Sequence, residues 1–143
     1  VIDSEPLKNL ISEFASHITV IRDGETNLEN LIEEGDLDSP KITSILQLHL
    51  PSLLKQHVDV IALGCTHYPF LKHKIQDMVG KNALVLDSGG AVARQTKRIL
   101  EANATLADKR SKDWYYTTGS ESAFEKTYEL LMGKHIQATH KEL

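Results

Sequence analysis

Residues 58–71, VDVIALGCTHYPFL, decide the fold of this 143-residue chain and include its only cysteine, Cys65. The apolar run at residues 58–63 has the composition of a buried strand and ends abruptly in a Gly-Cys-Thr-His turn. Pro69 then suits the first turn of a helix, which we expect at residues 69–78. Because open α/β sheets bind ligands beyond the carboxyl ends of their strands, this pattern places the thiol where such proteins usually carry out chemistry.

Strand-like and helix-like segments alternate along the rest of the chain. Runs rich in β-branched, apolar or aromatic residues predict further strands at residues 18–21, 83–86 and 112–117. Apolar residues at helical spacing predict a long helix beginning at Pro40, one following residue 90, and others at residues 5–16, 26–34 and 121–132. Strands joined by crossover helices are typical of a parallel sheet. We therefore predict an α/β protein with a doubly wound, flavodoxin-like parallel sheet.

Local signals mark several boundaries of these elements. Gly35 can end the second helix, and Ser120 can cap the last one. Pro51 lies inside the helix that begins at Pro40, so we expect a kink or a restart there. The polar tail after residue 133 is expected to fray.

The composition, 41% hydrophobic and 25% charged, is typical of a soluble globular protein of about one domain. No apolar run approaches the roughly 18 residues that a membrane span needs. A net charge of −4 disfavours nucleic acid as a partner. One cysteine cannot form an internal disulfide and no secretory segment opens the chain, so we expect a reducing cytoplasm. The first residues read like the middle of a protein, so we interpret the chain as a fragment of a longer one.

Three adjacent residues in the turn after the strand can carry chemistry. The partial positive end of a following helix favours the thiolate form of Cys65. Thr66 offers a hydroxyl and a backbone donor suited to a carboxylate. His67, if its ring turns inward, can exchange a proton with the thiol or with a substrate. The turn therefore combines an acid/base group with an anion site.

Other interpretations of the same residues stay open. A lone cysteine at the end of an apolar strand is also typical of a small buried core residue. Cys65, His67 and His73 are too few and too irregularly spaced for a structural zinc site, so we expect no metal. A hydrolase would need a base and an orienting carboxylate that the sequence does not identify. Asp87 and Ser88 fit either a helix cap or a ligand site.

The nonapeptide LGCTHYPFL at residues 63–71 closely resembles the signature around the second cysteine of glutamate racemases, in the aspartate/glutamate racemase family. LIEEG at residues 31–35 resembles a segment that precedes this signature in the family. VLDSGGAVARQ at residues 85–95 resembles a stretch that follows it. The resemblance covers nearly the whole chain from about Ile18 onward and implies a truncated aspartate/glutamate racemase-like fold.

This resemblance implies an enzyme that interconverts L- and D-glutamate without a cofactor, using one cysteine on each face of the α-carbon. Cys65 would be the cysteine of the carboxyl half, which serves the L-enantiomer in the family. The resemblance also implies that Thr66 binds a substrate carboxylate and that His67 assists Cys65. Glu33 would be the auxiliary acid, with Glu34 as its nearest competitor. The D-glutamate would supply peptidoglycan synthesis, and so cell shape, in a bacterial cytoplasm.

The family's amino-terminal motifs, including its first cysteine, do not occur in this sequence. We therefore expect residues 1–87 to form most of the second, inserted racemase domain, and residues 88–143 to be the return segment that completes the first domain. A chain with one of two bases should be inactive alone. It should also expose an apolar face, which a homodimer would cover.

Three alternatives to a glutamate racemase stay open. An aspartate racemase is one of them, because specificity depends partly on segments that this sequence does not include. A single-cysteine decarboxylase of the same family would need only one protonating thiol. A non-catalytic α/β binding module would use the chain as supplied as its functional unit.

Overall fold

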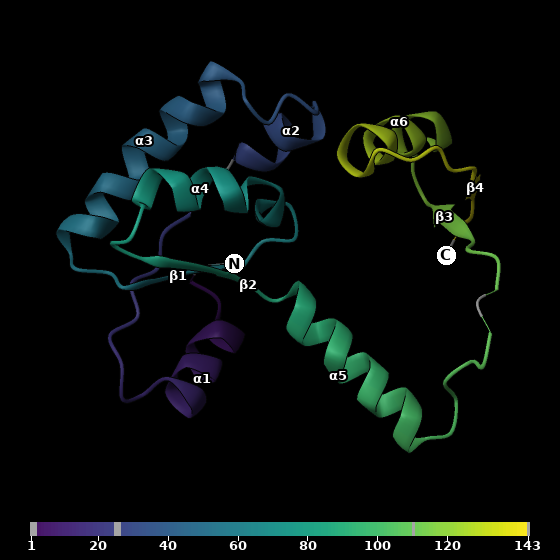
Figure 1. Cartoon of the computed structure of the whole chain (residues 1–143), viewed down its shortest axis with the longest axis horizontal. Coiled ribbons are helices and arrows are strands. Elements are labelled where there is room, and N and C mark those ends of the chain that lie inside the picture. Colours follow the sequence, from purple (N-terminus) through teal and green to yellow (C-terminus); the bar gives the residue numbers. More distant parts are fainter. Residues whose placement is uncertain (1–2, 25–26, 110, 143) are drawn as a thin grey trace.

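The computed structural model describes residues 3–24, 27–109 and 111–142 (Figure 1). Helices and strands alternate from β1 onward, after three helices. The helices are α1 (Glu5–Phe14), α2 (Leu28–Glu33), α3 (Pro40–Lys55), the 3-10 helix η1 (Tyr68–Leu71), α4 (Lys72–Val79), α5 (Gly89–Ala102) and α6 (Glu121–Met132). The strands are β1 (Val60–Leu63), β2 (Leu84–Asp87), β3 (Tyr115–Thr117) and β4 (Ala138–His140).

Within the described residues the strands form two separate parallel pairs. β1 pairs with β2, and this register sets Leu63 opposite Asp87 at the carboxyl ends. β3 pairs with β4, with Tyr115 opposite Ala138. A helix crosses over between the partners of each pair, α4 in the first and α6 in the second (Figure 1). The parallel strands with crossover helices confirm the predicted α/β class.

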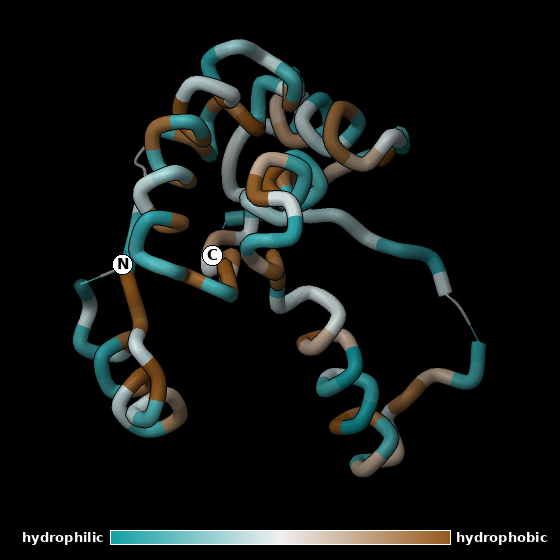
Figure 2. The backbone as a smooth tube through the Cα atoms, turned by 60° about the vertical axis from the view of Figure 1, so that its left-hand side comes forward, coloured by the Kyte–Doolittle hydropathy of each residue, from teal (hydrophilic) through white to brown (hydrophobic). Residues whose placement is uncertain are grey.

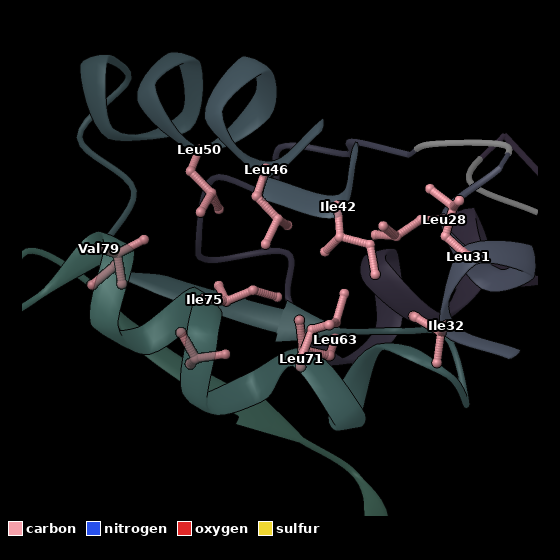
Figure 3. Packing of buried hydrophobic residues seen from close by; sticks show 12 residues of the cluster. Leu28, Leu31, Ile32, Ile42, Leu46, Leu50, Leu63, Leu71, Ile75 and Val79 are labelled. Atoms are coloured by element: carbon pink, nitrogen blue, oxygen red, sulfur yellow. The ribbon is translucent and has the colours of Figure 1, made fainter. Parts of the chain in front are cut away.

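The hydrophobic core lies between the β1–β2 sheet and helices α2, α3 and α4 (Figure 3). α3 contributes Ile42, Leu46 and Leu50, which recur at helical spacing on its inward face. Ile75 and Val79 of α4 face the same interior. Among the described residues, the buried apolar side chains are Leu28, Leu31, Ile32, Ile42, Leu46, Leu50, Leu63, Leu71, Ile75, Val79, Ala83 and Val85.

The β1–β2 sheet is buried on one face only. Leu63 and Val85 point into the core, whereas Val60, Leu84 and Leu86 on the alternate positions are exposed. In Figure 1, α1 lies on the side of the β1–β2 sheet opposite α3 and α4, but none of its residues is buried. The expectation of a fully buried strand at residues 58–63 is therefore only half right, because a strand is buried on both faces only when helices cover both.

The side chain of Gln76 on α4 completes the hydrogen bonding of β2 on the side away from β1. Its amide nitrogen donates to the Ala83 carbonyl at 2.9 Å and to the Gly80 carbonyl at 2.8 Å. Its amide oxygen accepts from the Val85 N–H at 2.9 Å. Gln76 thus satisfies backbone groups that a further strand would otherwise pair with.

The carboxyl-terminal part of the chain has its own small layer of helix and sheet. Tyr115 of β3 meets Tyr128 of α6 edge to face, with ring centroids 5.2 Å apart and the hydroxyls 3.2 Å apart. Glu125 of α6 accepts a 2.8 Å hydrogen bond from the Ala138 N–H of β4. The predicted fraying after residue 133 is therefore wrong, because carboxylates of α6 hold a strand there.

Two further expectations differ from the structure. Residues 18–21 form no strand, and Ile18, Val20 and Ile21 are exposed. A strand needs a neighbour for its backbone groups, and none of the described strands pairs with this segment. A kink or a restart was expected at Pro51, and the restart is wrong, since α3 continues through this residue. Pro51 lies on an exposed face, where water can bond the carbonyl that proline leaves without a donor.

Hydropathy along the backbone shows how much apolar surface stays uncovered. Hydrophobic and hydrophilic residues alternate along α5 (Figure 2). Its apolar side chains Val92 and Ile99 are 59% and 50% exposed. After α5, a long loop connects this helix to the β3–β4 pair (Figure 1). The prediction that residues 88–143 complete a separate domain stays a prediction. Among the described residues, none of the helices combines the length and apolarity needed to cross a bilayer.

Candidate active site at the carboxyl ends of β1 and β2

The candidate site begins where β1 ends. The polar turn at residues 64–67 follows Leu63 directly, and η1 then starts at Tyr68 with Pro69 in its first turn. Leu63 is opposite Asp87 in the sheet, so this turn lies beside the start of α5. The expected position of Cys65 beyond a parallel strand is confirmed.

Cys65 and His67 face each other across this turn. The Cys65 Sγ lies 3.8 Å from Nδ1 of His67, and both side chains are half-buried. Cys65 is a free thiol that solvent reaches, so the alternative of a sealed core cysteine does not fit its position. A half-buried thiol beside an imidazole has the arrangement that proton transfer to and from sulfur requires.

Glu33 approaches the same histidine from α2. Its Oε1 lies 2.8 Å from Nε2 of His67, and the two residues are 34 positions apart in the sequence. An ionised carboxylate can only accept a hydrogen bond, so Nε2 carries the hydrogen and Nδ1 is left facing the thiol. Cys65, His67 and Glu33 thus form a continuous relay of a thiol, an imidazole and a carboxylate.

Glu34 does not join this relay. It lines a separate open hollow of about 600 Å³ between α2 and α3, together with Lys41 and Ser44. The difference follows from helix geometry, because successive residues at the end of α2 point about 100° apart. The geometry therefore brings Glu33, and not Glu34, to His67.

Thr66 lies in the same turn and is exposed. Its position next to Cys65 agrees with the expected carboxylate-binding role, which stays a prediction. Among residues 3–24, 27–109 and 111–142, no three His, Cys, Asp or Glu side chains gather as metal ligands.

Lys72 and Asp87 form an ion pair at the carboxyl end of β2. Lys72 in the first turn of α4 donates to Asp87 Oδ2 at 2.6 Å, and the Gly89 N–H donates to Asp87 Oδ1 at 2.9 Å. The bond from Lys72 and the bond from Gly89 lower the pKa of Asp87 below its ordinary value. Asp87 thus bonds the first backbone N–H of α5, whereas Ser88, the N-cap residue, makes no side-chain cap bond. Lys72 was not predicted as part of the site. Its charge, four residues after Tyr68, was the signal that could have suggested an acidic partner at the carboxyl end of β2.

Comparison with known proteins points to one group of relatives. No protein-family model matches the chain. A glutamate racemase of Pseudomonas syringae pv. tomato is 42% identical over 107 residues, which are 75% of this chain and 39% of that protein. A glutamate racemase of Herpetosiphon aurantiacus is 38% identical over 130 residues, covering 89% of this chain and 51% of that protein.

Solved structures give the same answer for the fold. The crystal structure of a glutamate racemase isoform from Bacillus anthracis superposes with a TM-score of 0.87 at 29% identity, covering 99% of this chain and 54% of that one. A Thermus thermophilus glutamate racemase in complex with β-chloro-D-alanine matches with a TM-score of 0.69 at 31% identity, covering 80% of this chain and 44% of that one.

The fold, the relay at the strand tips and these relatives define the class as the amino-acid racemases of α/β architecture. The chain spans about half the length of the curated relatives it matches. Within that class it belongs to the glutamate racemase family, as a part of the full-length protein.

Proposed function

We propose that this chain carries one of the two proton-transfer groups of a glutamate racemase, with Cys65 as the base for the L-enantiomer. The observation that carries the proposal is the relay in which Cys65 Sγ lies 3.8 Å from His67 Nδ1 and His67 Nε2 lies 2.8 Å from Glu33 Oε1. Glutamate racemases are the relatives that share this part of the fold.

The relay can prepare the thiol for its task. The Glu33 carboxylate, 2.8 Å from Nε2 of His67, fixes the imidazole ring with Nδ1 toward the thiol. Nδ1 of His67, 3.8 Å from Sγ, can then exchange a proton with Cys65. The thiolate is the form that can remove a proton from carbon, and the protonated thiol is the form that can return one.

The proposed reaction needs two opposed groups. The Cys65 thiolate takes the α-proton of L-glutamate, and the electron pair of the broken C–H bond moves into the adjacent carboxylate. A second acid on the opposite face then delivers a proton to the same carbon. Thr66, in the turn beside the thiol, would bind a substrate carboxylate through its hydroxyl or backbone N–H. These steps use no cofactor and no metal.

The chain holds a single cysteine, so we infer that it does not invert glutamate alone. In the complete protein the other cysteine would come from the portion of the relatives that this chain does not span. The proposal also includes a cytoplasmic enzyme that supplies D-glutamate for peptidoglycan and so supports cell-wall growth and cell shape. These roles rest on the family resemblance.

Exchange in deuterated water tests the proposal. The chain would be fused behind the uncovered amino-terminal portion of the Pseudomonas syringae relative and incubated with L-glutamate in D₂O. We expect the fusion to give α-deuterated D-glutamate, the chain alone to give none, and Cys65→Ser in the fusion to abolish inversion. Lys81→Ser, at an exposed turn far from the relay in sequence, is the control and should leave inversion unchanged.

Three results would contradict the proposal. Inversion by the isolated chain would exclude the need for a second base. Inversion by the Cys65→Ser fusion would exclude the thiol as a base. Inversion of aspartate but not of glutamate by the fusion would assign the chain to the aspartate racemases.

A further inference from the structure

Helix α2, which carries Glu33, is short and depends on its neighbours. It has six residues, far fewer than the roughly 12–15 that an isolated helix needs in water. Leu28, Leu31 and Ile32 hold its inner side in the core. Its carboxyl end, where Glu33 emerges toward His67, is also in contact with α6. The position of the Glu33 carboxylate therefore depends on contacts made beyond α2 itself.

A further contact with α6 is made at Gly35, two residues after the end of α2. Gly35 has φ +85°, and its N–H donates to the Ile32 carbonyl at 3.0 Å, which closes the helix. A methyl group at Gly35 would lie 3.0 Å from both Cβ and Cδ1 of Leu130. The backbone of this turn thus lies flat against the Leu130 side chain, with no room for a larger residue.

The next residue of α6 anchors this helix on the core. Leu131 packs against the main hydrophobic core, so α6 is anchored there by one leucine while the other covers the Gly35 turn. Leu130 is 48% exposed, and its packing on Gly35 is therefore a local contact, separate from the buried core. Loss of its side chain would free the end of α2 without opening the interior.

From this arrangement we infer that Leu130 is a positioning residue, which holds the Gly35 turn so that Glu33 stays within hydrogen-bond distance of His67. The inference rests on the proposed function, since it gives the Glu33 carboxylate a task at Cys65. It links the return segment at residues 88–143 to a relay built entirely from residues 28–71. The expected consequence of removing Leu130 is a loss of thiol reactivity, because His67 loses its carboxylate partner for part of the time.

The rate of Cys65 alkylation by iodoacetamide in the intact chain tests this inference, because the chain has one thiol. At pH 7 we expect Leu130→Ala to slow alkylation about three- to tenfold, the range typical of coupling between groups in one network. Leu130→Met, which conserves volume, should restore most of the rate. Met132→Ala is the matched control, since Met132 is equally exposed, at 49%, on the same turn of α6.

A double-mutant cycle separates positioning from general loosening of the fold. Glu33→Gln should slow alkylation by at least as much as Leu130→Ala, and adding Leu130→Ala to Glu33→Gln should have no further effect. The inference is overturned if Leu130→Ala behaves like Met132→Ala, if its effect persists undiminished without the Glu33 carboxylate, or if Glu33→Gln leaves the rate unchanged. Alkylation does not require turnover, so a fusion that fails to racemise glutamate refutes the proposed function and leaves this result standing.

Discussion

Replacing Gln76 by methionine should destabilise the chain well beyond the cost of an ordinary surface substitution. Methionine keeps the length and most of the volume of the side chain but removes its amide group. Three hydrogen bonds to backbone groups around β2 are lost, at 2.8–2.9 Å in the structure. The affected backbone lies at the edge of the core, where Val85 is 2% and Ala83 is 5% exposed.

The magnitude follows from which of these groups water can reach afterwards. The Val85 N–H becomes an unpaired donor in a buried residue, which costs about 1–3 kcal/mol. The bond to the Ala83 carbonyl contributes about 0.5–1.5 kcal/mol, and the exposed Gly80 carbonyl exchanges its donor for water at little cost. We therefore expect Gln76→Met to lower the free energy of unfolding by about 1.5–4.5 kcal/mol.

Urea denaturation followed by far-UV circular dichroism measures this difference. Gln56→Met is the matched control, because Gln56 donates one 3.2 Å bond to an exposed helix carbonyl, that of Ser52. The control should change the free energy of unfolding by less than about 0.5 kcal/mol. Hydrogen exchange at the Val85 amide should also become faster in Gln76→Met than in the control. Equal destabilisation by the two variants would refute the reasoning.

Three further predictions concern the strand tip, the Gly35 turn and the last helix. Lys72→Met should remove the bond that lowers the pKa of Asp87. A carboxyl group with a lowered pKa stabilises the fold above its unfolded pKa, and this stabilisation is lost as the pH falls. Thermal unfolding of Lys72→Met between about pH 5 and 2 should therefore be less pH-dependent, and an unchanged acid limb would contradict this prediction. Gly35→Ala should cost about 1–3 kcal/mol in denaturant titrations through its φ of +85°, whereas Gly64→Ala, with no atom within 4 Å of the added methyl, should be near neutral, and equal costs would argue against strain at Gly35. Ser120→Ala should cost about 0.5–2 kcal/mol, because the Ser120 hydroxyl accepts from the Ala123 N–H, and Ser120→Asp should recover most of it in the same assay.

The parts of the site that depend on local pattern could be predicted from the sequence. The apolar run before Cys65 and the proline after it mark a strand followed by a helix, and these two signals suffice to place the thiol. Gly35 is likewise a local signal: it marks the end of α2, since few residues other than glycine adopt its positive φ. The contact of Glu33 with His67 joins residues far apart in sequence; the family resemblance suggested only that both residues serve the site, and spacing could not show that they touch.

The errors arose where long-range pairing decides the structure. Residues 18–21 have the β-branched composition of a strand, but composition cannot supply a neighbour for the backbone. The tail was missed for the opposite reason, because β4 is short and polar and shows no strand pattern. It forms through β3 on one side and through α6 carboxylates on the other, with Glu121 accepting from the His140 N–H at 2.5 Å and Glu125 from Ala138.

The amide of Gln76 also affects which edge of the β1–β2 sheet is open to another strand. An open strand recruits another strand through its unpaired N–H and C=O groups, and such growth continues only when both sides of a sheet are free. Gln76 already bonds the Ala83 carbonyl and the Val85 N–H on the outer side of β2, whereas β1 has no second neighbour among the described strands. A further strand would therefore meet fewer unpaired backbone groups beside β2 than beside β1, so β1 is the more open edge of this sheet.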